Sequence, residues 1–219
     1  MKNIKGAIFD MDGTLIDSLM IWEVLWDCFG NKFLNGEKFC PSEEADKAVR
    51  TMTLKDAMNY LYDIYHIGNS GEELFDFATE TMQNFYSQEV MLKKGVLEFL
   101  EHCHQNGVKM CIASATEAAL IKTALKHCNI EKYFSEIFSC ADIGKGKEEP
   151  DVYLMALEYL GTEKEETYVF EDSQIAIDTA HKIGICTVGI YDKYNYGQDK
   201  IRQTATEYIA EGETLEKLI

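Results

Sequence analysis

The polarity pattern of this chain predicts one part in which strands and helices alternate and one part that is purely helical. Short continuous apolar runs, typical of buried strands, occupy residues 7–9, 108–113, 136–140, 167–170 and 185–190. Helical patterns follow them at 95–106, 116–128, 150–160 and 173–183, and a short strand and a final helix are expected at 208–209 and 214–219. This alternation indicates βαβ units and a mostly parallel sheet.

A long segment without strand pattern separates the first expected strand from the others. A helix is expected over 17–29, and residues from about 31 to 90 read as helical. Within them, Thr53 with Asp56 and Ser70 with Glu73 have the spacing of a capping box, which starts a helix. Thr162 with Glu165 has the same spacing near the fourth strand.

These patterns predict an α/β protein with two parts. Residues 1–16 and 91–219 are expected to form a Rossmann-like catalytic core, a mostly parallel sheet with helices on both faces. Residues 17–90 are expected to form a small, inserted, all-helical cap domain. The paired Trp22 and Trp26 lie four positions apart on the first cap helix, and we expect them to pack together rather than to contact a substrate.

Composition and charge narrow the classes of function. The chain has 219 residues, 46% of them apolar, which predicts a globular protein. Its net charge of −17 disfavours nucleic acid and anionic membrane as partners, because both are negatively charged. It has no apolar run near 18 residues and no signal-peptide pattern at its N-terminus, so we expect a cytoplasmic protein. We also expect a monomer.

Cysteine usage points to a reducing compartment. The seven cysteines are scattered, odd in number and without a C-x-x-C pair, so we interpret them as reduced, small apolar residues. The run His102-Cys103-His104 resembles a metal site, but neighbouring residues of a helix point in different directions. We therefore do not expect a metal there.

The most distinctive stretch is IFDMDGTL at 8–15, in which two carboxylates follow a buried strand. Asp10 and Asp12 would repel each other unless a cation or a shared proton lies between them. Gly13 would allow a sharp turn whose backbone amides face an anion. Oxygen ligands at one strand end suit a hard cation such as Mg²⁺. An Asp-rich turn remains the structural alternative, whereas a calcium EF-hand fails because Leu15 and Ile21 occupy its glycine and glutamate positions.

Other polar residues follow the remaining strands, and ligands bind at this edge of parallel sheets. Ser114, with the amide of Ala115, is suited to phosphate oxygens, although it could equally be an ordinary helix cap. Lys147 can hold a carboxylate ionised, with a solvated loop lysine as the alternative and Lys145 as the second candidate. The pair Glu171-Asp172 can complete an oxygen cage for Mg²⁺ or simply cap a helix.

Taken in order, these segments resemble the four motifs of the haloacid dehalogenase superfamily of phosphohydrolases, whose first motif is D-x-D-x-[TV]. The resemblance covers nearly the whole chain. The stretches LKKGV (92–96), IASA (112–115) and FEDS (170–173) look most like the β-phosphoglucomutase-like branch, where a small helical cap follows the first motif.

The resemblance implies a Mg²⁺-dependent phosphatase that hydrolyses a small phosphorylated metabolite through an aspartyl-phosphate. It assigns Asp10 as the nucleophile and Asp12 as the general acid and base. Lys147 would join them in catalysis, and together with Ser114 and Ala115 it would hold the phosphoryl group.

The same resemblance implies the metal ligands. Mg²⁺ would be bound by Asp10, by Asp12 through its carbonyl, and by Asp172, with Glu171 assisting. The chain departs from the family pattern at three positions. Glu148 stands where the family usually has proline, and Ala176 stands where it usually has glycine. Thr51 replaces the glycine that usually begins the cap motif G-x-[ST].

A sugar phosphomutase of the β-phosphoglucomutase type is the alternative activity. Those enzymes carry an arginine just after the cap motif, and here Leu54 follows it, with Arg50 as the only nearby arginine. This difference favours hydrolysis. Dehalogenase chemistry is disfavoured because it needs neither the second Asp nor a metal, and a non-catalytic module usually lacks one of the acids that are present here.

Overall fold

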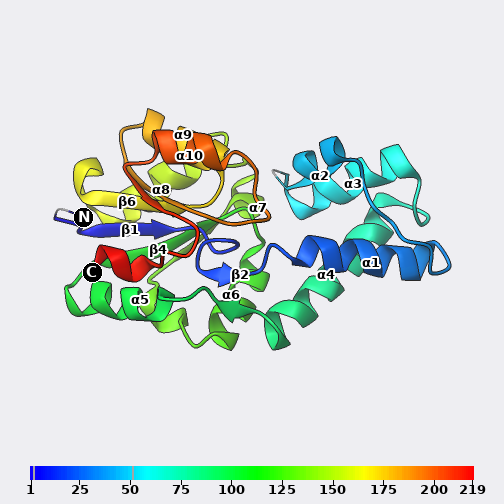
Figure 1. The fold of residues 1–219 in the computed structure, drawn as a ribbon, viewed down its shortest axis with the longest axis horizontal. Helices are drawn as coiled ribbons and strands as arrows, with labels where there is room; N and C mark the ends of the chain where they lie inside the picture. Colours follow the sequence, from blue (N-terminus) through cyan, green and yellow to red (C-terminus); the bar gives the residue numbers. More distant parts are fainter. Residues whose placement is uncertain (2, 51) are drawn as a thin grey trace.

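The computed structural model describes residues 1, 3–50 and 52–219, and a six-stranded parallel sheet forms its centre (Figure 1). The strand order is β5-β4-β1-β6-β7-β8. Their bounds are β1 Gly6–Phe9, β4 Lys109–Ser114, β5 Ile137–Ser139, β6 Thr167–Glu171, β7 Cys186–Ile190 and β8 Glu207–Ile209. This confirms the expected α/β class and mostly parallel sheet.

Helices cover both faces of the sheet. On one face, Ile8 and Val169 pack against α8 (Asp151–Leu160) and α9 (Gln174–Lys182). On the other face, Phe9 stacks on Phe170 of the neighbouring strand with ring centroids 4.4 Å apart. This second face is covered by α5 (Val96–Gln105) and α6 (Ala118–His127), and α10 (Gln198–Thr204) lies near α9 (Figure 1).

Among the described residues between β1 and α5, four helices extend away from the sheet (Figure 1). They are α1 (Ile21–Phe33), α2 (Glu43–Val49), α3 (Leu54–Tyr65) and α4 (Gly71–Gln88), and we refer to residues 17–90 as the cap. The side chains of Thr53 and Ser70 accept hydrogen bonds from the amides of Asp56 and Glu73, which confirms both cap-segment helix starts. The positions of the two domain boundaries stay predictions.

Several short elements differ from the expectation. Residues Ile16–Asp17 form β2, which pairs antiparallel with β3 (Met91–Leu92), so the first cap helix begins at Ile21 rather than at 17. A short helix α7 (Cys140–Ile143) and α10 were not expected. Three 3₁₀ segments complete the chain, at Glu131–Tyr133, Lys164–Glu166 and Leu215–Leu218.

The predicted capping box at Thr162 is wrong. Its hydroxyl lies 2.7 Å from the hydroxyl of Thr167, and no side chain caps the 3₁₀ segment that follows. The final expected helix is likewise only a 3₁₀ turn. Among the described residues, no helix is both long and apolar enough to cross a membrane.

Candidate active site

The ends of neighbouring strands bring the predicted acids to one edge of the sheet. Phe9 and Phe170 are register partners in β1 and β6, so Asp10 directly follows one strand beside the end of the other at Glu171. The amide of Asp10 donates to the carbonyl of Phe170 at 3.0 Å, which fixes this register beyond the strand. Ser114 ends β4 on the other side of β1.

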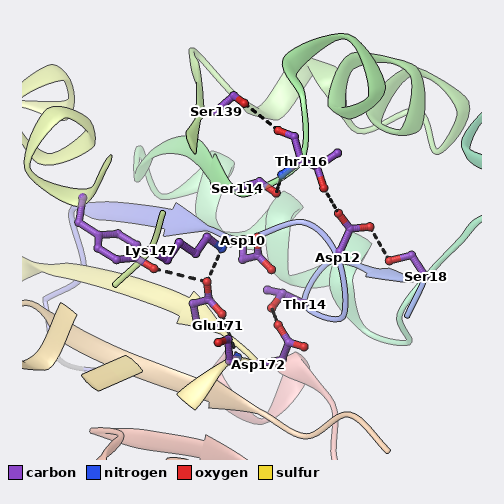
Figure 2. Close-up of polar contacts among 12 residues, drawn as sticks. Asp10, Asp12, Thr14, Ser18, Ser114, Thr116, Ser139, Lys147, Glu171 and Asp172 are labelled. Atoms are coloured by element: carbon purple, nitrogen blue, oxygen red, sulfur yellow. Dashed lines mark hydrogen bonds and ion pairs between the residues drawn. The ribbon is translucent and has the colours of Figure 1, made fainter. Parts of the chain in front are cut away.

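Lys147 lies among these acids (Figure 2). Its Nζ is 2.6 Å from Oδ1 of Asp10 and also contacts Oε1 of Glu171. Burial lowers the pKa of Lys147, but the charges of Asp10 and Glu171 outweigh it and leave the pKa well above its usual value. The lysine is therefore a permanent cation in this site. The other candidate, Lys145, pairs with Asp151 at 2.7 Å instead.

Three buried acids could hold a metal ion. Carboxylate oxygens of Asp10, Glu171 and Asp172 all lie within 4.8 Å of one another. Burial raises the pKa of Glu171 to about 7, with Lys147 opposing and Asp10 adding to the shift. Burial, then the charges of Glu171 and Asp10, raises the pKa of Asp172 well above its usual value. Three carboxylates facing one lysine leave excess negative charge, which a divalent cation would offset.

Hydrogen bonds from two other segments hold the carboxylate of Asp172. Thr14 donates to its Oδ1 at 3.2 Å, and the side-chain amide of Asn195 donates to its Oδ2 at 2.8 Å. Gly13 makes room for it, because a Cβ at this position would lie 2.3 Å from Oδ2 of Asp172. Gly13 also has a φ of +73°, a conformation that favours glycine. Its amide donates to the carbonyl of Ile16 at 3.1 Å within the turn.

The carboxylate of Asp12 points away from the three acids (Figure 2). Its oxygens accept hydrogen bonds from the hydroxyls of Ser18 at 2.6 Å, Tyr86 at 2.7 Å and Thr116 at 2.7 Å. Burial, with the charge of Asp10, raises the pKa of Asp12, while the three hydroxyls lower it without cancelling the shift. Asp12 is thus inclined to carry a proton. The side chain of Asp12 is not one of the three that could share a metal ion. The resemblance implies instead that Asp12 would bind the metal through its backbone carbonyl.

Ser114, the last residue of β4, is buried. The hydroxyl of Ser114 accepts a hydrogen bond from the amide of Thr116 at 3.2 Å, and helix α6 begins only at Ala118. Ser114 and Ala115 line the same cavity as Asp10 and Lys147.

This cavity has a volume of about 310 Å³ and lies between core and cap residues. That volume lies within the usual size range of small-molecule sites. The core contributes the acids, Lys147 and Ser114, whereas the cap contributes Trp22, Arg50 and Met52 among others. Trp22 and Trp26 pack together as expected, with ring centroids 5.5 Å apart, and Trp26 is buried while Trp22 also lines the cavity.

Comparison with known proteins identifies the family. A sequence model described as haloacid dehalogenase-like hydrolase matches residues 7–190 of this chain. The chain belongs to this family.

Relatives of this haloacid dehalogenase-like hydrolase span its whole length. It is 24% identical over 216 residues to a phosphorylated carbohydrates phosphatase of Thermotoga maritima, with 98% of both chains covered. It is 28% identical over 206 residues to protein CbbY of Rhodobacter capsulatus, covering 90% of this chain and 89% of the relative.

Solved structures share the fold. The structure of a putative beta-phosphoglucomutase from Thermotoga maritima superposes with a TM-score of 0.78 at 24% identity and covers 98% of each chain. CbbY from Rhodobacter sphaeroides, solved in complex with phosphate, gives a TM-score of 0.80 at 18% identity, covering 94% of this chain and 93% of that one. The sequence model confirms the expected family, and the solved structures confirm the fold. The departure expected at Thr51 lies outside the described residues.

Sequence reasoning missed four residues of this hydrolase site. Ser18, Tyr86 and Thr116 bind Asp12, and Asn195 binds Asp172. Thr116 stands two positions after Ser114, so its nearness to the strand end was a usable signal. Tyr86 lies 74 positions from Asp12, and no local pattern connects them.

Proposed function

We propose that this protein is a Mg²⁺-dependent phosphatase that hydrolyses a small phosphorylated metabolite through an aspartyl-phosphate. The observation that carries the proposal is the placement of Asp10 in a cavity with one buried cation, Lys147, and two further acids. The family membership and the relatives named as phosphatases support the same reaction class.

The proposed first step transfers the phosphoryl group to Asp10. A carboxylate oxygen of Asp10 forms a bond to phosphorus, and the bond from phosphorus to the ester oxygen breaks. Lys147, held 2.6 Å from Asp10, orients this carboxylate and offsets negative charge on the transferring group. Ser114 and the amide of Ala115 are proposed to bind the phosphate oxygens.

Asp12 is the proposed general acid and base. Its raised pKa favours the protonated form that gives a proton to the leaving alcohol. Asp12 then takes a proton from a water molecule that attacks phosphorus, the bond to Asp10 breaks, and inorganic phosphate leaves. Each proton that Asp12 gives is recovered in the second step, so the cycle balances.

The acid cluster fits a divalent cation. We propose that Asp10 and Asp172 hold Mg²⁺ by their side chains and Asp12 by its carbonyl. Glu171 is proposed to assist in binding the ion. Its carboxylate already contacts Lys147 and accepts a hydrogen bond from the amide of Ser173 at 3.0 Å. When bound, Mg²⁺ would offset negative charge on the phosphoryl oxygens.

The cap supports hydrolysis over phosphomutase chemistry. A mutase must hold the second phosphate of a sugar bisphosphate with an available cation. Arg50 lines the cavity, but its Nε and Nη2 donate to Asp46 at 2.8 and 3.2 Å. Lys47 is paired with Glu43 at 2.5 Å. Both cap cations that line the cavity therefore already have a carboxylate partner. We expect the protein to act as a monomer with the cap excluding water.

A screen of phosphorylated metabolites, with inorganic phosphate as the readout, tests the proposal. We expect steady phosphate release that chelator abolishes and Mg²⁺ restores, without stimulation by a sugar bisphosphate. Absence of release from every ester would overturn the proposal. Conversion of a hexose 1-phosphate to its 6-phosphate with little phosphate released would decide for the mutase.

A further inference from the structure

One side of the cavity is an apolar wall made of five cap side chains and one side chain of the core helix α6. These side chains belong to α1, α3, α4 and α6 and to the short segments that precede α1 and α3. They are Leu19, Trp22, Met52, Leu54, Met82 and Leu120. Phosphate chemistry needs none of them, so they face the part of the substrate that leaves as an alcohol.

Several of the polar groups next to this wall already have partners. The carboxylate of Asp46 accepts hydrogen bonds from Trp26 at 3.2 Å, from Arg50 and from Tyr196 at 3.2 Å. Asn195 uses its side-chain amide on Asp172 and accepts from the amide of Tyr196 at 2.9 Å. Sugar hydroxyls that lie against the apolar side chains of the wall would find no hydrogen-bond partner there, and each such buried group costs free energy.

Trp22 provides the flat surface in this wall. It is only partly buried, and it packs on Trp26 with ring centroids 5.5 Å apart. The guanidinium of Arg50 lies 5.9 Å from the centre of the Trp22 ring, which places a cation beside the indole. Nη1 of Arg50 is buried and makes no hydrogen bond among the described residues, so one donor remains next to the indole.

We infer that the substrate is a phosphomonoester of an alcohol with an uncharged aromatic body, which packs against Trp22. The inference rests on the proposed function and names its substrate class. Aromatic pairs are favourable beyond the apolar area they bury, and the wall offers apolar contacts on the remaining sides. Glu117 and Glu148, which also line the cavity, disfavour a second anionic group on the substrate.

Matched primary alkyl esters test this inference, because their leaving alcohols differ little in reactivity. We would compare 2-phenylethyl phosphate with glycerol 3-phosphate and glucose 6-phosphate, measuring phosphate release with Mg²⁺. We expect kcat/KM to be at least about tenfold higher for the aromatic ester. Trp22→Leu should lower kcat/KM for the aromatic ester by about tenfold more than it lowers kcat/KM for glycerol 3-phosphate.

Val24→Ala is the matched control, because Val24 lies on the same helix but is exposed and does not line the cavity. Val24→Ala should leave kcat/KM unchanged for both the aromatic ester and glycerol 3-phosphate. Preference for the polyol phosphates, or an unchanged preference in Trp22→Leu, would overturn the inference while leaving the phosphatase intact. No phosphate release from any ester would instead remove the proposed function, and this inference with it.

Discussion

Asp12 accepts three short hydrogen bonds from hydroxyl groups, and still its pKa is raised. Hydrogen bonds to a carboxylate favour its charged form, whereas burial and the neighbouring charge of Asp10 oppose it. Burial is the largest of these effects here. The environment of Asp12 therefore shifts its pKa in the direction that favours the protonated form, as its proposed role requires.

Replacing Asp12 with Asn tests the role of the acid. Asp12→Asn keeps the size of the side chain and removes proton transfer, so we expect kcat to fall by about 10²–10⁴-fold. Asp17→Asn is the control, because Asp17 is an exposed acid of β2. Steady-state phosphate release measures both. Equal activity of the two variants would show that Asp12 moves no proton.

Glu171 predicts a pH dependence of stability in the metal-free protein. Its pKa in the folded state is about 7, against an ordinary value of 4.5, so the native state binds the proton more tightly than the unfolded state. The free energy of unfolding should therefore fall as pH rises between these two values. Added Mg²⁺ favours the charged form and should reduce this fall.

Thermal unfolding in chelator at about pH 5 and about pH 8 measures this effect. Wild type should lose more stability between the two conditions than Glu171→Gln, which carries no titrating group at this position. Glu211→Gln, at an exposed position, should behave like wild type. The same pH dependence in wild type and Glu171→Gln would contradict the assignment.

At the scale of elements, the segment after β7 connects the core acids to the cap. Asn195 binds Asp172, and the next residue, Tyr196, donates its hydroxyl to Asp46 of α2. At the start of the segment, the buried Asp192 pairs with Lys93 at 2.7 Å. A single loop thus positions one of the three buried acids and contacts a helix across the cavity.

Asn195→Ala should weaken Mg²⁺ binding. Removing a group that orients a metal ligand typically lowers metal affinity by about 10–100-fold, and here the lost donor holds Oδ2 of Asp172. Calorimetric titration with Mg²⁺ measures the dissociation constant without needing a substrate. Tyr196→Phe, which removes only the contact with Asp46, should keep wild-type affinity. Unchanged affinity in Asn195→Ala would mean that Asp172 does not need this support.

The elements also mark the limits of what the sequence predicts. Long strands and capped helices were predictable because their apolar patterns and caps are local, as at Thr53 and Ser70. The β2–β3 pair was missed because each strand has two residues, too short for a pattern. The capping box at Thr162 was wrong because the competing contact with Thr167 is formed only in the folded chain.

At the scale of the whole molecule, the rule that ligands gather at the carboxyl ends of parallel strands predicted most of the site. It identified Asp10, Ser114 and the acids after β6 without any contact information, and the structure places them in one cavity. It could not find Tyr86 or Asn195, because α4 and the loop after β7 reach the acids only through tertiary packing.

The net charge of −17 makes the local positive charge of Lys147 important for any anionic substrate. Lys147 is only 11% exposed and lies against Asp10 and Glu171, so its charge acts on the site rather than on the surrounding solvent. This placement reconciles a strongly acidic protein with a phosphorylated substrate.

The nucleophilic role of Asp10 is the central claim about this molecule, and phosphate release by Asp10→Asn tests it most directly. The best ester of the screen would be given to wild type and to the variant at saturating Mg²⁺, with thermal unfolding as the check that both are folded. We predict steady release by wild type and none above background by the variant, because an amide does not attack phosphorus. Release by a folded Asp10→Asn protein at a rate near that of wild type would contradict the aspartyl-phosphate mechanism.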